Sequence, residues 1–244
     1  MNTMSRASSS GAMPPAPARM LASDNVAGAH PLVIEALVAA NAGHALAYGN
    51  DDHTRRAERM FDEVFGCETR TLFVYGGTGA NVLALASILQ QAECVICTNW
   101  SHIHVDETGA PERVLGAKLL DLPCPDAKLT PEQVRAAAGA RGNPHHAQPG
   151  VVSLTQPTEL GTLYTPAEVR AICDAAHEHG MLVHMDAARV GNATAALGGT
   201  RAALRSFTVE AGVDVLSFGG TKNGAMLAEA VVFLKDGLGE DFRF

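Results

Sequence analysis

The stretch Val213-Asp-Val-Leu-Ser-Phe-Gly-Gly-Thr-Lys-Asn-Gly224 gives the clearest indication of the fold. An apolar run of β-forming residues ends in two glycines and leads one lysine, Lys222, into a loop of small residues. We therefore predict a buried strand over 213–218 with a lysine directly beyond its carboxyl end. Burial favours the neutral amine of a lysine, which is the form that attacks a carbonyl carbon.

Polar groups follow other apolar runs in the same way. The sequence His184-Met-Asp-Ala-Ala-Arg189 ends a predicted strand with a carboxylate, and Gly76-Gly-Thr-Gly-Ala-Asn81 joins a strand to a helix. Apolar strands that alternate with helices predict an α/β fold, a mostly parallel sheet with helices on both faces. Since ligands of such sheets bind at the carboxyl ends of the strands, we expect these groups to converge on one edge.

The expected elements follow from periodicity and from turn residues. Apolar spacing predicts helices at 31–40 and 52–65 and from the glycine loop to about residue 91, and Thr130-Pro and Thr165-Pro open two more through near-identical capping boxes. The sequence further predicts an apolar segment at 114–122 and a surface loop at 141–149 with solvated His145 and His146. Predicted strands are 71–75, 94–98, 151–154, 181–185, 213–218 and 230–234.

Composition limits the class of protein. The chain has 244 residues, of which 47% are hydrophobic, and suits one large α/β domain. A net charge of -8 argues against nucleic acid as a partner, and no apolar stretch approaches the roughly 18 residues that would suggest a membrane span. Five scattered cysteines indicate a reduced, cytoplasmic protein; Cys94 and Cys97 fit a buried strand better than a metal or redox site. Residues 1–22 fit a disordered N-terminal tail better than a transit peptide.

Three of these motifs together indicate one cofactor. The glycine loop offers backbone N–H groups for a phosphate, Asp186 can hold a pyridine nitrogen protonated, and Lys222 can form a Schiff base. Each has a simpler reading: a tight turn, a helix cap and a surface lysine, respectively. In this chain order, however, the three are the parts that a pyridoxal 5'-phosphate (PLP) enzyme requires.

With four further motifs, the chain resembles a known family over about residues 20–244. These motifs are Ser23-Asp-Asn25, Tyr48-Gly-Asn-Asp51, Ser101-His-Ile103 and Thr155-Gln-Pro-Thr-Glu-Leu-Gly161. The family is the L-threonine aldolase branch of the β-eliminating lyase group, fold type I PLP enzymes of the aspartate aminotransferase superfamily. The resemblance implies a PLP-binding large domain over 23–244. It also implies a small C-terminal domain that is missing after Phe244, since members of the family continue beyond the lysine.

The resemblance also implies a role for each matching residue. Lys222, His102 and Asp186 would be catalytic. Lys222 would carry the cofactor, and Asp186 would pair with its ring nitrogen. His102 would stack on the ring, although sequence alone favours a histidine at a helix start. The phosphate would lie on Gly77 and Thr78, and the substrate would contact Arg189, Ser23 and Tyr48. No metal is expected. Many family members carry histidine where this chain has Thr158, so a contact to the substrate hydroxyl is in doubt.

The expected reaction is retro-aldol cleavage of L-threonine, or of a related β-hydroxy-α-amino acid, to glycine and an aldehyde. The base that removes the hydroxyl proton is left open between His102, water and a phosphate-linked group. The alternatives are another PLP-dependent β-eliminating lyase and a non-catalytic PLP-binding fragment. In this family, subunits complete each other's sites, so a homodimer or homotetramer is expected, with Tyr48 near the partner's cofactor.

Overall fold

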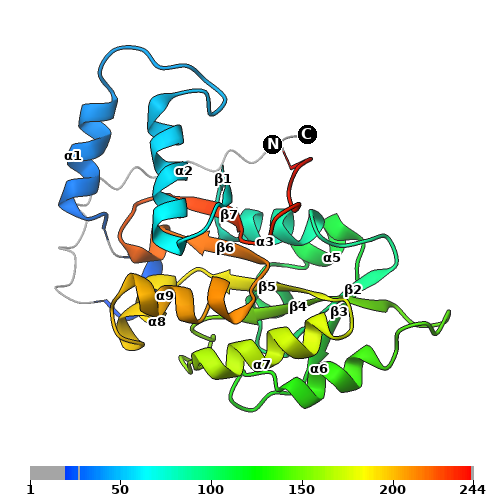
Figure 1. The fold of residues 1–244 in the computed structure, drawn as a ribbon. Helices are drawn as coiled ribbons and strands as arrows, with labels where there is room; N and C mark the ends of the chain where they lie inside the picture. The colour runs from blue at the N-terminus through cyan, green and yellow to red at the C-terminus, as the bar shows by residue number, and fades with distance from the viewer. Residues whose placement is uncertain (1–19, 27, 243–244) are drawn as a thin grey trace, which may run out of the picture.

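The computed structural model describes residues 20–26 and 28–242, and within them seven strands form one sheet (Figure 1). The strand order is β1-β7-β6-β5-β4-β2-β3, and β7 runs in the direction opposite to the other six strands. The mostly parallel sheet predicted from the sequence is therefore confirmed. The strands are β1 (Arg70–Val74), β2 (Glu93–Thr98), β3 (Leu119–Leu122), β4 (Gln148–Thr155), β5 (Leu182–Ala187), β6 (Val215–Gly219) and β7 (Glu229–Phe233).

Helices connect the strands and cover both faces of the sheet (Figure 1). Thr130 and Thr165 form the two predicted capping boxes, each with proline in the first turn. The α-helices are α1 (Pro31–Ala40), α2 (Asp52–Phe65), α3 (Gly77–Ala86), α4 (His102–Val105), α5 (Ala110–Leu115), α6 (Pro131–Ala138), α7 (Pro166–His177), α8 (Val190–Ala196) and α9 (Arg201–Ser206). Short 3-10 turns lie at η1 (Asp24–Val26), η2 (Val209–Ala211) and η3 (Thr221–Asn223).

Side chains that alternate along the strands belong to two separate hydrophobic cores. In β2, Ile96 packs into the core beneath α6 and α7, whereas Val95 packs into the core beneath α3. In β6, Leu216 and Val215 divide between the two cores in the same manner. Successive side chains of a strand point to opposite faces, so an apolar strand requires cover on both sides. The two cores hold the sheet rigid and thereby fix the edge at which the parallel strands end.

Most predicted elements lie within two residues of their observed bounds, with two corrections. The apolar segment at 114–122 is not one element, because Gly116, in the left-handed region at φ 62, ends α5 and β3 begins at Leu119. The helix after the glycine loop ends at Ala86 rather than near residue 91. Cys94 and Cys97 lie buried in β2 as free thiols, and His145 and His146 are exposed, as predicted.

The helix α1 and the segment after it project from the body of the molecule beside α2 (Figure 1). None of the α1 residues is buried, although the helix carries exposed Leu32, Ile34, Leu37 and Val38. Within 20–26 and 28–242, no helix is both long enough and apolar enough to cross a membrane. The predicted tail at 1–22 lies almost entirely outside the described residues, so it stays a prediction.

Candidate active site

A cavity of about 270 Å³ opens where β5 and β6 end and where β7 begins. We call this side of the sheet the carboxyl edge. Because β7 is antiparallel, its first residue, Glu229, pairs with Val74 of β1 and Gly219 of β6, the last residues of those strands. The cavity brings together six of the eight predicted site residues: Gly77, Thr78, His102, Asp186, Arg189 and Lys222.

The loop that carries Lys222 is held against the loop that follows Asp186. A Cβ atom on Gly219 would lie 2.5 Å from the Cα atom of Ala188, so only glycine permits this approach. The Asn223 side chain donates to the carbonyl oxygen of Gly219 at 2.6 Å and to that of Ala188 at 3.1 Å. These contacts fix the turn η3 and place Lys222 at the cavity wall.

Asp186 is 5% exposed and presents its carboxylate to the cavity at the end of β5. Its Oδ1 accepts a hydrogen bond from the backbone N–H of Ala188 at 3.0 Å. Its Oδ2 accepts one from Nδ2 of Asn81 at 3.0 Å. Two donors therefore hold the carboxylate in one orientation.

The glycine loop leaves the start of α3 open to the cavity. Gly76 has φ 81, and no side chain caps the helix, so its first N–H groups remain available to a ligand. A Cβ atom on Gly76 or Gly79 would meet no atom within 4 Å, which shows open space in front of the helix. The nearest atom to a Cβ on Gly77 is Oε2 of Glu229 at 4.0 Å.

His102 begins α4, where Ser101 is the N-cap residue. Its backbone N–H donates to Oε1 of Glu159 at 2.7 Å, and its ring Nδ1 lies 2.9 Å from Oε1 of Glu107. The hydrogen bond with Glu107 raises the pKa of His102 above its ordinary value, although burial acts in the opposite direction. Burial raises the pKa of the Glu159 carboxyl.

Arg189 lies at the cavity with its guanidinium bonded to both carboxylate oxygens of Asp24. Burial would raise the pKa of Asp24, but the hydrogen bond and charge of Arg189 outweigh it and hold the pKa below its ordinary value. Asn25, the next residue of η1, also lines the cavity. The start of the chain thus closes one side of the site.

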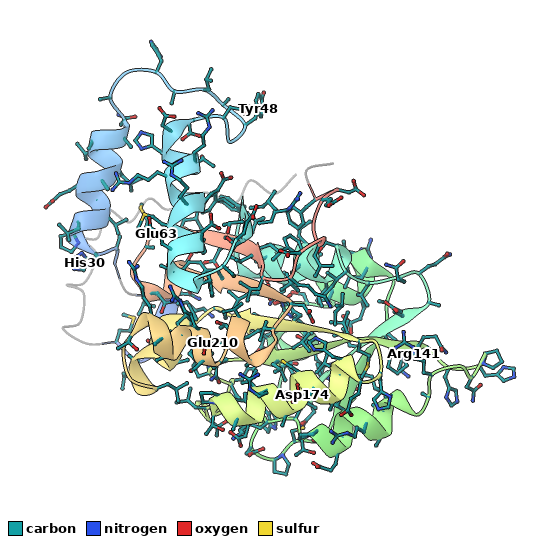
Figure 2. The ribbon with its side chains drawn as sticks, in the orientation of Figure 1. His30, Tyr48, Glu63, Arg141, Asp174 and Glu210 are labelled. Carbon is teal, nitrogen blue, oxygen red and sulfur yellow. The ribbon has the colours of Figure 1, made fainter. Side chains whose placement is uncertain are left out.

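Two predicted substrate contacts lie outside the cavity lining. Ser23 accepts a hydrogen bond from the backbone N–H of Asn25 at 3.2 Å. Tyr48 is fully exposed at φ 62, at the far end of the projecting segment (Figure 2). Thr158 is buried and bonds the hydroxyl of Thr162 at 2.7 Å. The roles predicted for Ser23 and Tyr48 therefore stay predictions.

Several polar residues of the cavity have little or no signal in the sequence. Asn81 stands at the end of the glycine motif, and Glu107 follows His102 by five residues without a recognisable spacing. Glu229, which is 6% exposed, accepts from the backbone N–H of Thr221 at 3.3 Å. Ser217 bonds Nε2 of His184 at 2.8 Å beneath the cavity. Among the described residues, no group of three or more His, Cys, Asp or Glu could hold a metal ion.

A mostly parallel sheet with a lysine loop and a glycine loop at its carboxyl edge defines the class: this is an aspartate aminotransferase-like large domain. The solved aspartate aminotransferase of Rhodobacter sphaeroides superposes with a TM-score of 0.61 and 17% identity. The match covers 83% of this chain and 54% of that chain. The likeness supports the fold that was predicted from the sequence.

The family follows from closer comparisons. The family model described as Beta-eliminating lyase matches residues 20–239, and the chain belongs to this family. It is 44% identical to the low specificity L-threonine aldolase of Pseudomonas aeruginosa over 227 residues. This alignment covers 93% of this chain and 65% of that protein. The chain therefore spans somewhat less than two thirds of the length of that relative. A solved threonine aldolase of Leishmania major superposes with a TM-score of 0.83 at 32% identity, covering 90% of this chain and 64% of that one.

Membership of this family indicates PLP as the cofactor, and the cavity has the groups to hold it. The open N-terminus of α3 suits a phosphate, the carboxylate of Asp186 suits a protonated ring nitrogen, and Lys222 supplies an amine. The volume lies near the lower end of the roughly 300–1,000 Å³ of small-molecule sites. The carboxylate of Glu229 also lies beside the glycine loop.

Proposed function

We propose that this protein cleaves L-threonine, or a related β-hydroxy-α-amino acid, to glycine and an aldehyde, with PLP as cofactor. The observation that carries the proposal is the convergence of Lys222, Asp186 and the open start of α3 on one cavity. The 44% identity to a low specificity L-threonine aldolase supports the choice of substrate.

The residues divide the work among them. Lys222 supplies the amine that attaches the cofactor, Gly77 and Thr78 bind its phosphate, and Asp186 holds its ring nitrogen protonated. When bound, PLP supplies a protonated ring that accepts the electron pair released as the Cα–Cβ bond breaks. A carboxylate that is already held by two donors needs no reorientation as that charge develops, which is a main source of electrostatic catalysis.

Arg189 is the group proposed to bind the substrate carboxylate. A guanidinium offers paired N–H donors that match the two oxygens of a carboxylate, and Arg189 already binds Asp24 in this manner. Asp24 therefore occupies the donors that the substrate needs. Binding of an amino acid requires that this ion pair opens or shares its donors.

Incubation of the purified chain with PLP and L-threonine tests the proposal. Glycine and acetaldehyde in equal amounts support it, and the Lys222→Ala variant is the matched control without the reactive amine. Production of 2-oxobutanoate and ammonia would instead favour a β-eliminating lyase. A yellow chromophore without any turnover would favour the second alternative, a non-catalytic PLP-binding fragment.

Assembly is the second part of the proposal. The exposed apolar side chains of α1 and the fully exposed Tyr48 lie on a projecting segment that has no cover within the described chain. We propose that this segment packs on a second copy in a homodimer, or in a tetramer of two dimers, with Tyr48 near the partner's cofactor. Light scattering tests this. A strictly monomeric protein that cleaves threonine at full rate would contradict it.

The compartment is proposed to be the cytoplasm. The five cysteines are free thiols, and four of them are buried. A protein without disulfides suits a reducing compartment. Fractionation of the native host, with the chain detected by antibody, tests this assignment.

A further inference from the structure

A buried chain of hydrogen bonds connects Asp186 to His102 through two residues that the proposed function does not use. The Nδ2 atom of Asn81 lies 3.0 Å from Oδ2 of Asp186 and 2.8 Å from Oε1 of Glu107. The same Oε1 lies 2.9 Å from Nδ1 of His102. Asn81 is 2% exposed and Glu107 is 3% exposed, so water does not compete for these bonds.

The chemistry of these groups fixes the direction of each bond. An amide nitrogen only donates, so the oxygens of Asp186 and Glu107 that meet Asn81 are acceptors. The reverse orientation of the amide would put its oxygen between two carboxylate oxygens, which would repel it. With Glu107 ionised its oxygen only accepts, and Nδ1 of His102 then carries the proton and donates it to Glu107. The ring nitrogen Nε2 is therefore the one left for other partners.

The charges around His102 favour a second proton on the ring. Glu107, from the turn after α4, bonds the ring itself. Asp186 of β5 adds a negative charge, whereas Lys222 of η3 opposes the protonated form. Glu159, on the loop after β4, accepts the backbone N–H of His102. Carboxylates thus outnumber the cation, and an opposite charge in hydrogen-bond contact stabilises the charged ring.

We propose that Glu107 is a positioning residue that holds His102 as an imidazolium at neutral pH, and that Asn81 ties this pair to Asp186. At one end is Asp186, which the proposed function places on the ring nitrogen of the cofactor, and at the other is His102, which lines the same cavity. Glu107 and Asn81 act only through them. An imidazolium has no free lone pair, so His102 then acts as a proton donor through Nε2. The base for the substrate hydroxyl must accordingly be another group, which removes one of the candidates left open by the sequence.

The test is a titration of His102 by nuclear magnetic resonance in the full chain with PLP bound and its histidines labelled with nitrogen-15. The His102→Gln variant assigns the signal. The proposal expects a ring that is still protonated on both nitrogens at pH 7, with a pKa raised above its ordinary value and Nδ1 protonated throughout. In Glu107→Gln the pKa falls toward or below 6.5, and Asn81→Ala moves it less. Glu132→Gln, which removes an exposed carboxylate from α6, leaves it unchanged.

A His102 ring that is mostly neutral at pH 7 in wild type, or equal pKa values in wild type and Glu107→Gln, would overturn the proposal. If Glu107→Gln does not fold, the wild-type titration is decisive by itself. Glu107→Asp is then the second variant, because it keeps the negative charge. No substrate is present in this experiment. Its failure is therefore distinguishable from a failure of the proposed threonine cleavage.

Discussion

The guanidinium of Arg189 and the carboxylate of Asp24 form a two-point ion pair at the wall of the cavity, with Nη2 and Oδ1 3.3 Å apart. The two residues lie 165 positions apart in the chain, so this pair ties the first described turn to the end of β5. Because the pair is partly exposed, opening it costs a ligand little binding free energy.

Removal of the Asp24 charge should improve substrate binding. In Asp24→Asn, Arg189 no longer has a charged partner to give up, so KM for L-threonine should fall by up to about fivefold with little change in kcat. Steady-state kinetics measure this. Glu178→Gln, which removes an exposed carboxylate that pairs with Arg135, is the control and should leave KM unchanged. A higher KM in Asp24→Asn would mean that Asp24 itself supports binding of the substrate.

The Asp186→Asn variant should retain PLP but lose most of its activity. The amide cannot balance a pyridinium charge, so we expect kcat to fall about 100-fold or more, the scale of losing one preorganised electrostatic contact. Cofactor content is measured from the visible spectrum and turnover from acetaldehyde release. Near-normal turnover would show that Asp186 serves only to cap the loop after β5.

Buried His184 should make the protein sensitive to acid. It lies between the hydroxyls of Ser153 and Ser217, and burial lowers its pKa to about 4. In the unfolded chain the His184 ring takes up a proton near pH 6.5, whereas in the native state it does so only near pH 4. The free energy of unfolding therefore decreases as pH falls from about 6.5 toward 4. The full contribution is present above pH 6.5. The loss over that range is roughly 3 kcal/mol for this one group.

Urea unfolding at pH 7.5 and 4.5 tests this sensitivity. The difference in unfolding free energy between the two pH values should be smaller in His184→Asn than in wild type. The exposed His145→Asn variant should behave as wild type. An undiminished difference in His184→Asn would assign the acid sensitivity to other groups.

Gly219→Ala should destabilise the fold at the site itself. Its new Cβ would lie within 2.8 Å of three backbone atoms of Ala188, and backbone cannot yield cheaply. We expect a loss of about 2 kcal/mol or more in unfolding free energy, together with weaker PLP binding. Gly79→Ala is the matched control, because its Cβ would meet no atom within 4 Å. Denaturant unfolding compares the two variants, and equal stability would contradict the close approach of Gly219 to the backbone of Ala188.

The sequence predicted those parts of the structure that depend on local chemistry. Thr130 and Thr165 start helices because a hydroxyl, a proline and a Gln or Glu satisfy the first N–H groups within four residues. Strand ends were displaced by up to three residues, the most at the start of β4, since apolar runs do not show where pairing stops. The antiparallel direction of β7 was not predicted, because a strand buried on both faces reads alike in either direction.

The site was predicted only where a motif marks it. Lys222 and Asp186 each follow an apolar strand, so topology alone brings them together. Glu107 is different, because its partner Asn81 is 26 residues away and no periodicity links the two. Such contacts depend on how α3 and the turn after α4 pack, and that packing has no local signature in the sequence.

The central claim is that Lys222 is the amine that binds the cofactor. Reduction of the PLP-loaded protein with borohydride makes this linkage permanent, and peptide mass spectrometry then locates it. We expect a phosphopyridoxyl group on Lys222 and its complete loss in Lys222→Ala. The same group on Lys118, Lys128 or Lys235, with Lys222 unmodified, would show that Lys222 is not the amine that binds the cofactor.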